Sequence, residues 1–216
     1  MAEQDLTIPE AYHRWYYDNR VWEQVHWMGI PCLKSVSDLW SYQEIIAQLR
    51  PGLIVEFGTR HGGAAMYFAH VGTLVRPDCR VFTVDTDHTD LHTDVRSHPS
   101  IDTFLGRSTD PVVLSQLHER RDRNPGPVFA ILDSDHSKNN VLAEMKSLRD
   151  FLVTGDYLVV EDGNINGHPV LPGWGEGPWE AIEAYFDQYP GDYVHDITVE
   201  ERFGFTFAPR GFLKRL

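Results

Sequence analysis

An apolar run stops abruptly on charged side chains in the stretch Ile131-Leu132-Asp133-Ser134-Asp135-His136. A second stretch, Val159-Val160-Glu161-Asp162, ends in the same way. Continuous apolar runs are typical of buried parallel strands, and open α/β sheets hold their ligands at the carboxyl ends of such strands. We therefore predict one crevice that collects four carboxylates and one imidazole. Because like charges repel, the crevice needs a neutralising partner, and a hard cation such as Mg²⁺ is the simplest one.

Strand-like and helix-like segments alternate around these two strand ends. Strands are predicted at 53–57, 80–84, 101–105, 128–132 and 157–160, with closing strands at 193–198 and 204–207. Helices are predicted at 37–49, 62–75, 110–121, 137–152 and 178–189. This alternation favours a parallel, doubly wound sheet. The long Gly-, Pro- and Asn-rich loop 163–177 follows the second acidic strand end, and loops of this length are usually functional or mobile.

The composition is typical of a soluble globular protein, with 42% hydrophobic and 24% charged residues in a chain of 216. We divide the chain into an N-terminal helical arm, residues 1–50, and a catalytic domain, residues 51–216. The net charge of −13 argues against a nucleic-acid partner. With no signal pattern and no apolar run near the ~20 residues of a membrane span, we expect a cytoplasmic protein. The aromatic-rich arm is expected to pack on the core or on a second subunit of a homodimer; a substrate lid is the alternative.

A glycine-rich turn follows the first strand of the catalytic domain, in Glu56-Phe57-Gly58-Thr59-Arg60-His61-Gly62-Gly63. Glycines let a ligand approach the backbone closely, and the helix N-terminus that follows favours an anionic group. Asp85 ends the next strand, where an acidic side chain can accept the hydroxyls of a ribose. Because the glycine spacing does not fit a pyrophosphate clamp, we predict S-adenosylmethionine rather than NAD. The predicted cofactor-binding residues are Glu56, Gly58, Thr59, Gly62, Asp85, Ser108 and Asp133.

Four segments together resemble the cephalosporin hydroxylase/rhamnosyl O-methyltransferase family: EFGTRHGG at 56–63, TVDTD at 83–87, LDSDHSK at 132–138 and VEDGNINGHPV at 160–170. The resemblance spans residues 53–189. It implies a Rossmann-like class I methyltransferase, with a mostly parallel seven-stranded sheet, an antiparallel last strand and helices on both faces. It also implies a saccharide acceptor, and at its closest the 1-hydroxyl of 3-O-methylmannosides in methylmannose polysaccharide synthesis.

The same resemblance implies a metal site. Its pattern places one ligand after the fourth strand and an acidic pair after the fifth, and the spacing of 26 residues from Asp135 to Glu161 is similar to that of the family. The ligands of Mg²⁺ or Mn²⁺ are therefore expected to be Asp135, Glu161 and Asp162. Catechol-type methyltransferases, which look similar here, align their ligand with Asp133 instead.

His136 is the expected general base, because it takes the place of the catalytic lysine in catechol-type enzymes and titrates near neutrality. Lys138 is a weaker candidate. His61 and His168 lie in the expected site loops and could bind substrate hydroxyls. Trp174 and Trp179 flank the long loop, where each could stack on a sugar ring or anchor the loop.

Other classes of protein remain open. A metal-dependent hydroxylase would need a 2-His-1-carboxylate set, which the sequence does not display. A methyltransferase of a different small molecule and a non-catalytic sugar-binding protein would keep the same fold. Consumption of O₂ and 2-oxoglutarate, or turnover of S-adenosylmethionine, separates these classes.

Overall fold

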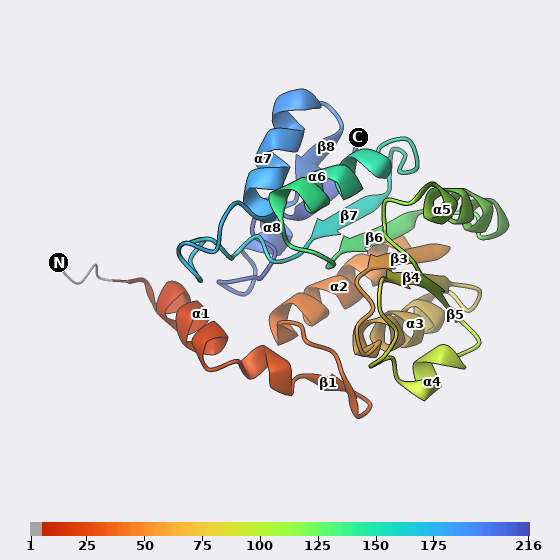
Figure 1. Cartoon of the computed structure of the whole chain (residues 1–216), viewed down its shortest axis with the longest axis horizontal. Coiled ribbons are helices and arrows are strands. Elements are labelled where there is room, and N and C mark those ends of the chain that lie inside the picture. Colours follow the sequence, from red (N-terminus) through yellow and green to blue (C-terminus); the bar gives the residue numbers. More distant parts are fainter. Residues whose placement is uncertain (1–5) are drawn as a thin grey trace.

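One mixed sheet of seven strands forms the centre of the computed structural model, which describes residues 6–216. The strand order is β5-β4-β3-β6-β7-β9-β8, and β9 runs antiparallel to both of its neighbours (Figure 1). The strands are β3 (Leu53–Phe57), β4 (Arg80–Asp85), β5 (Ile101–Leu105), β6 (Val128–Leu132), β7 (Tyr157–Val160), β8 (Tyr193–His195) and β9 (Phe212–Arg215). This topology confirms the predicted class I methyltransferase fold, including the single antiparallel strand.

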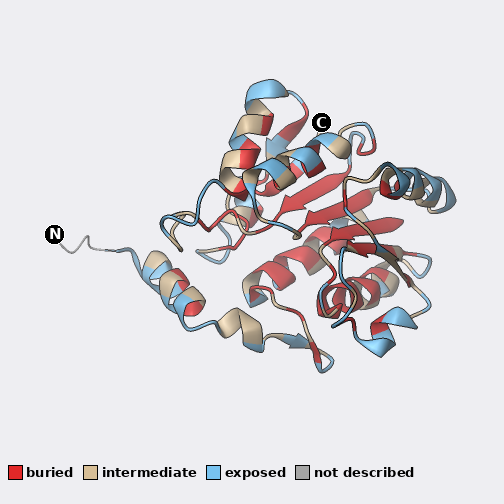
Figure 2. Ribbon diagram, viewed as in Figure 1, coloured by how far each residue is buried: buried red, intermediate tan, exposed pale blue. Residues whose placement is uncertain are grey.

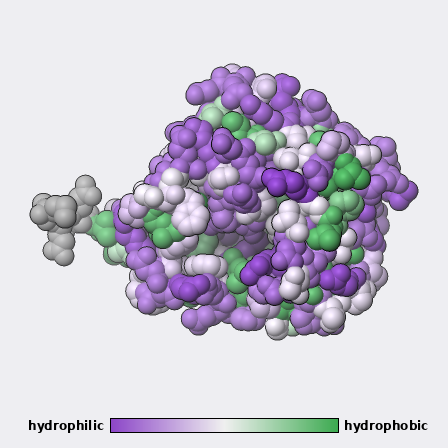
Figure 3. Space-filling model, in the orientation of Figure 1, coloured by the Kyte–Doolittle hydropathy of each residue, from purple (hydrophilic) through white to green (hydrophobic). Residues whose placement is uncertain are grey.

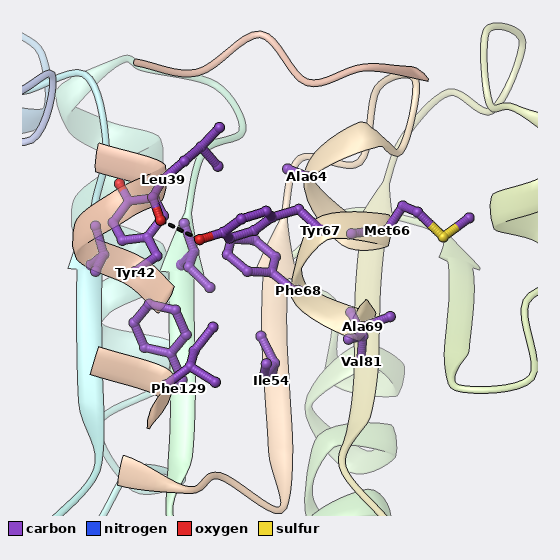
Figure 4. Packing of buried hydrophobic residues seen from close by; sticks show 14 of the residues in the cluster. Leu39, Tyr42, Ile54, Ala64, Met66, Tyr67, Phe68, Ala69, Val81 and Phe129 are labelled. Carbon is purple, nitrogen blue, oxygen red and sulfur yellow. Dashed lines mark hydrogen bonds between the residues drawn. The ribbon is translucent and has the colours of Figure 1, made fainter. Parts of the chain in front are cut away.

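Helices cover both faces of the sheet, because both faces of its strands are apolar. On one face, α2 (Val36–Leu49) and α3 (Gly63–Val75) pack over Ile54 and Phe129. Figure 4 shows this cluster, in which the Tyr67 hydroxyl of α3 donates to the carbonyl of Leu39 on α2. On the other face, α5 (Pro111–Arg123), α6 (Lys138–Ser147) and α7 (Pro178–Gln188) pack over Leu53, Val55 and Phe57. The strands are accordingly the most buried part of the molecule (Figure 2).

The N-terminal arm begins with α1 (Ile8–Asp18) and η1 (Val21–Gln24), followed by the short hairpin of β1 (His26–Trp27) and β2 (Ile30–Pro31). Tyr12 and Tyr16 of α1 pack on Phe205, with ring centroids 5.4 and 5.5 Å apart. Nε2 of His13 lies 2.9 Å from Nδ2 of Asn164 in the long loop. The arm therefore packs on segments near the other end of the chain. Two further helices are short, α4 (Thr93–Arg96) and α8 (Ile197–Glu200).

Three predicted elements differ from the structure. The strand predicted at 193–198 ends at His195, and Ile197 begins the short helix α8. Residues 204–207 are not a strand, because Phe205 and Phe207 pack on the aromatic rings of α1 and the amide of Phe207 donates to Oδ2 of Asp38, 2.8 Å away. The closing strand is β9, which begins after the turn at Gly211. The helix predicted over 137–152 ends at Ser147, and the next residues continue as a turn. Across residues 6–216, no helix combines the length and the apolarity that a membrane crossing requires.

Candidate active site

A cavity of about 620 Å³ lies at the carboxyl ends of β3, β4, β6 and β7. Figure 3 shows the face that carries it, where hydrophilic residues predominate around a hollow. Three groups of residues line the cavity. The first comes from the glycine turn, the end of β4 and the loop after β5: Gly58, Thr59, Asp85, Gly106 and Ser108. The second is charged: Asp133, Asp135, His136 and Asp162. The third is aromatic: Tyr17, Trp22, Trp174 and Phe207.

The glycine turn has the close backbone approach that its sequence predicts. Gly58 has φ +102°, and a Cβ at this position would lie 1.9 Å from the carbonyl oxygen of Asp133. Gly62, with φ +85°, is the N-cap of α3. Only glycine adopts such a conformation in so little space. The turn therefore leaves the cavity open beside the amino end of α3.

Glu56 lies beneath this turn and does not line the cavity. Its Oε2 accepts a hydrogen bond from the Thr83 hydroxyl at 2.6 Å, and the hydroxyls of Thr83 and Thr59 lie 2.7 Å apart. Burial raises the pKa of Glu56 to about 8. The side chains of Glu56 and Thr59 thus form one buried polar chain that supports the turn from below.

Asp85 and Ser108 lie on either side of the same end of the cavity. The Asp85 carboxylate accepts the backbone N–H of Arg60 at 2.8 Å and that of Asp87 at 3.1 Å. These bonds fix its orientation, and a carboxylate has lone pairs for further donors. The Ser108 hydroxyl instead donates to the buried carboxylate of Glu144, which also accepts the hydroxyl of Ser134.

Asp133, His136 and Asp162 form a compact group in which one ligand atom from each lies within 4.8 Å of the others. Nε2 of His136 is 3.3 Å from Oδ2 of Asp162. Asp162 has φ +55°, a left-handed conformation that is uncommon for a residue with a side chain. Such strain persists only where the surrounding structure enforces it, and it is frequent at functional sites.

Both His136 and Asp162 have raised pKa values, for different reasons. Burial lowers the pKa of His136, but the carboxylates of Asp162, Asp133 and Glu161 outweigh burial and raise it above the ordinary value. Burial raises the pKa of Asp162 to about 7, and His136 opposes that shift. The pair therefore holds a proton near neutral pH, as acid–base groups of active sites do.

A buried lysine, which the sequence did not predict to be part of the site, lies beside this group. Nζ of Lys34 lies 2.7 Å from Oδ2 of Asp133 and 2.8 Å from Oε1 of Glu161, and the lysine side chain is 1% exposed. The hydroxyl of Tyr42 donates to the same Glu161 oxygen at 2.6 Å. Burial lowers the pKa of Lys34, but the carboxylates of Asp133 and Glu161 outweigh burial and raise it well above its ordinary value. The only local signal was that this lysine directly follows an apolar stretch, Ile30 to Leu33.

The structure places the three predicted metal ligands differently. Asp162 belongs to the compact group, while Glu161 lies behind it against Lys34 and Tyr42. Asp135 is exposed, and its Oδ1 accepts the backbone N–H of Ser137 at 2.9 Å, just before α6. The group contains Asp133 in place of Asp135.

Other predicted candidates have partners of their own. Lys138 pairs with Glu176 at 2.7 Å. His168 stacks on Trp179, with ring centroids 4.2 Å apart, and its Nε2 lies 3.1 Å from Glu180. Trp179 therefore anchors the long loop, whereas Trp174 lines the cavity.

This fold and cleft define a class I methyltransferase. The chain belongs to the Rhamnosyl O-methyltransferase/CmcI family, whose model matches residues 19–216. It is an S-adenosylmethionine-dependent O-methyltransferase, as the sequence predicted.

Similar proteins support this assignment. The chain is 55% identical over 209 residues to a rhamnosyl O-methyltransferase of Mycobacterium tuberculosis (strain ATCC 25618 / H37Rv). The matched region covers 97% of this chain and 85% of the relative. It is 54% identical to a rhamnosyl O-methyltransferase of Mycobacterium leprae (strain TN), over 97% of this chain and 91% of the relative. A solved structure of CmcI with Mg and SAM superposes with a TM-score of 0.72 at 23% identity, covering 99% of this chain and 86% of that one.

Proposed function

We propose that this enzyme transfers the methyl group of S-adenosylmethionine to a hydroxyl of a rhamnosyl sugar. The observation that carries the proposal is the single cavity in which a glycine turn, an acid–base group and a set of aromatic side chains meet. The names of the relatives at 55% and 54% identity support a rhamnosyl acceptor.

The glycine-turn end of the cavity is the proposed cofactor site. Gly58 and Gly62 leave the backbone accessible, and Asp85 presents an oriented carboxylate at the end of β4, where ribose hydroxyls bind in related folds. Ser108 and Asp133 line the same cavity. When bound, S-adenosylmethionine supplies an electrophilic methyl group.

The donor set of the acidic group fits a hard divalent cation. Asp133 and Asp162 offer the oxygen ligands that Mg²⁺ and Mn²⁺ prefer, and we propose them as the holding residues in place of Asp135. When bound, the cation would supply positive charge that orients acceptor oxygens and lowers the pKa of a hydroxyl. Because Mg²⁺ binds imidazole less readily than carboxylate, His136 keeps its ring for proton transfer.

His136 is the proposed general base. Its Nε2 faces the acidic group and receives the proton of the acceptor hydroxyl. The carboxylate of Asp162, 3.3 Å away, stabilises the imidazolium that results. Much of the rate is expected from holding the acceptor oxygen in line with the methyl carbon and the sulfur.

The aromatic end of the cavity is the proposed acceptor site. Tyr17 and Trp22 of the arm face the same space as Trp174 of the long loop. Flat apolar rings of this kind suit the apolar face of a sugar ring, and sites for small molecules commonly combine apolar walls with a few polar groups. The arm is thus proposed as part of the catalytic unit.

The test is transfer of labelled methyl to a panel of sugars that includes a methyl rhamnoside and 3-O-methylmannose with a free 1-hydroxyl, with and without EDTA. We expect methylation of the rhamnoside, loss of turnover in EDTA, and recovery with Mg²⁺. Preferential methylation of 3-O-methylmannose at its 1-hydroxyl would restore the acceptor expected from the sequence. O₂ consumption without methyl transfer would overturn the proposal. The ligand set argues against this outcome, because the acidic group among the described residues contains one histidine and a 2-His-1-carboxylate site needs two.

Variants separate the two candidate ligand sets. Asp133→Asn and Asp162→Asn are each expected to abolish binding of Mn²⁺. The electron paramagnetic resonance signal of Mn²⁺ measures this binding. Asp135→Asn is the matched control, because Asp135 carries the same charge two residues from Asp133 but lies outside the group. Loss of Mn²⁺ binding in Asp135→Asn alone would return Asp135 to the ligand set.

A further inference from the structure

We infer that Lys34 is a resident counter-cation of the metal site: it holds Asp133 and Glu161 in place when no divalent cation is bound, and it limits how tightly such a cation binds. The inference rests on the proposed function, because it assumes that the acidic group binds a cation. It assigns to the arm a role in the chemistry of the site.

The Lys34 ammonium bridges carboxylates that follow two neighbouring strands, Asp133 after β6 and Glu161 after β7. Tyr42 of α2 adds a second donor to the same oxygen of Glu161. A single cation thus ties together the two strand ends that carry the metal site.

Charge gives a second reason. When ionised, Asp133, Glu161 and Asp162 carry three negative charges, and Lys34 supplies one positive charge among them. With His136 neutral, as a general base must be, the remaining charge of about −2 matches one divalent cation. Without Lys34 the same carboxylates would hold a charge of −3, which would repel itself in the empty site and attract a cation more strongly.

A buried lysine is costly to the stability of the fold. Removing two charged partners from water offsets much of their attraction, and apolar side chains of similar volume often serve stability as well or better. The chain nevertheless places Lys34 directly after Leu33, a non-glycine residue with φ +57°. Asp162, directly after Glu161, has φ +55°. A strained residue is therefore the chain neighbour of each partner in the Lys34–Glu161 ion pair. Strain of this kind is frequent at functional sites, which favours a functional reason for the buried lysine.

The test compares Mn²⁺ affinity, measured by electron paramagnetic resonance, in wild type, Lys34→Met and Tyr42→Phe. Methionine keeps a similar length without the charge. We expect Lys34→Met to bind Mn²⁺ at least about tenfold more tightly, because a nearby positive charge has been removed. Tyr42→Phe is the matched control, since it removes a hydrogen bond to the same oxygen but no charge, and its affinity should stay within about twofold of wild type.

Thermal unfolding gives a second readout that does not depend on activity. In EDTA, Lys34→Met should unfold at a lower temperature than wild type, and excess Mg²⁺ should raise its midpoint by more than it raises the wild-type midpoint. Lys34→Gln, which keeps a donor without the charge, should behave in the same way.

The outcomes separate the two proposals. If wild type binds no Mn²⁺, the proposed metal site fails. If wild type binds Mn²⁺ and Lys34→Met binds it equally or more weakly, the metal site stands and the role of Lys34 is overturned. If neither Lys34→Met nor Lys34→Gln folds with Mg²⁺ in excess, the lysine is a structural cation that the metal cannot replace, and the inference is likewise overturned.

Discussion

Nε2 of His136 lies 3.3 Å from Oδ2 of Asp162, so the loops that follow β6 and β7 bring an imidazole and a carboxylate together. The contact explains why the pKa of His136 is raised although burial alone would lower it. It also places the expected base next to a proposed ligand of the cation.

His136→Ala is expected to lower turnover by roughly 10²–10⁴-fold, the usual loss for a general base. The affinity for S-adenosylmethionine should change little, because His136 comes from the acidic group and not from the glycine turn. Steady-state kinetics and calorimetry measure the two quantities. His168→Gln is the control, since His168 is held by Trp179 and Glu180, and it should keep near-normal turnover. Loss of turnover in His168→Gln with near-normal turnover in His136→Ala would instead make His168 the general base.

Asp85→Ala is expected to weaken binding of S-adenosylmethionine by about 1–3 kcal/mol, the cost of leaving polar groups unpaired. Part of the loss comes from the N–H of Arg60, which donates to this carboxylate. Calorimetry of the purified variant measures the change. Unchanged affinity would remove Asp85 from the cofactor site.

Trp174→Ala should raise the KM for the acceptor by roughly tenfold, equal to about 1.4 kcal/mol of binding, with a smaller effect on the KM for the methyl donor. Trp40→Ala is the matched control, because Trp40 is 59% exposed and Trp174 is 57% exposed, yet Trp40 does not line the cavity. Equal kinetics for the two variants would make Trp174 a surface residue with no part in acceptor binding.

Gly58→Ala should destabilise the fold by more than about 3 kcal/mol, because its new methyl group would meet a backbone carbonyl at 1.9 Å. Gly155→Ala is the control. Gly155 has a similar φ, +94° against +102°, but nothing lies within 4 Å of a Cβ there, so only the left-handed conformation costs energy, about 1–2 kcal/mol. Urea unfolding measures both. Equal losses would show that conformation, and not the approach of Asp133, requires glycine at position 58.

Glu180 gives a prediction for stability against pH. Burial would raise its pKa, but the N–H of Gly177 and the side chains of Asn166 and His168 outweigh burial and lower it to about 2, from 4.5. The folded state therefore gains stability from this carboxylate above pH 4.5 and loses it as the pH falls toward 2, by at most roughly 3 kcal/mol.

The free energy of unfolding of Glu180→Gln should accordingly fall below that of wild type at pH 6, and the difference should shrink between pH 4.5 and pH 3. Glu183→Gln, on the same helix, removes a half-exposed carboxylate paired with Arg210 and should differ from wild type by no more than about 1 kcal/mol. A constant difference for Glu180→Gln across this range would contradict the lowered pKa.

Local sequence was sufficient for the centre of the sheet. The runs at 53–57, 128–132 and 157–160 coincide with β3, β6 and β7, because strands buried on both faces leave mainly apolar segments. The strand predicted at 101–105 coincides with β5, an edge strand that is only partly buried. The closing strand was misplaced because the aromatic residues at 204–207 have the β propensity of a strand. Their packing against α1 depends on contacts that no local pattern contains.

The site was predictable only in outline. Apolar runs that end on carboxylates located the acidic edge, but the choice between Asp133 and Asp135 depends on how the chain turns after β6. The Ser137 amide donates to Asp135, and this second carboxylate lies outside the compact group although it lines the same cavity. Lys34 left no local signal of its role, because its partners lie 99 and 127 residues further along the chain.

The packing of the arm has a consequence for the order in which a growing chain can become an enzyme. Tyr12 and Tyr16 rest on Phe205, and Asp38 accepts the amide of Phe207. Synthesis proceeds from the N-terminus, and segments made first usually fold first. Here the aromatic part of the docking surface of the first helix does not exist until the ribosome has passed residue 207. The aromatic end of the cavity, with Tyr17 and Trp22, is therefore expected to be assembled among the last steps of folding.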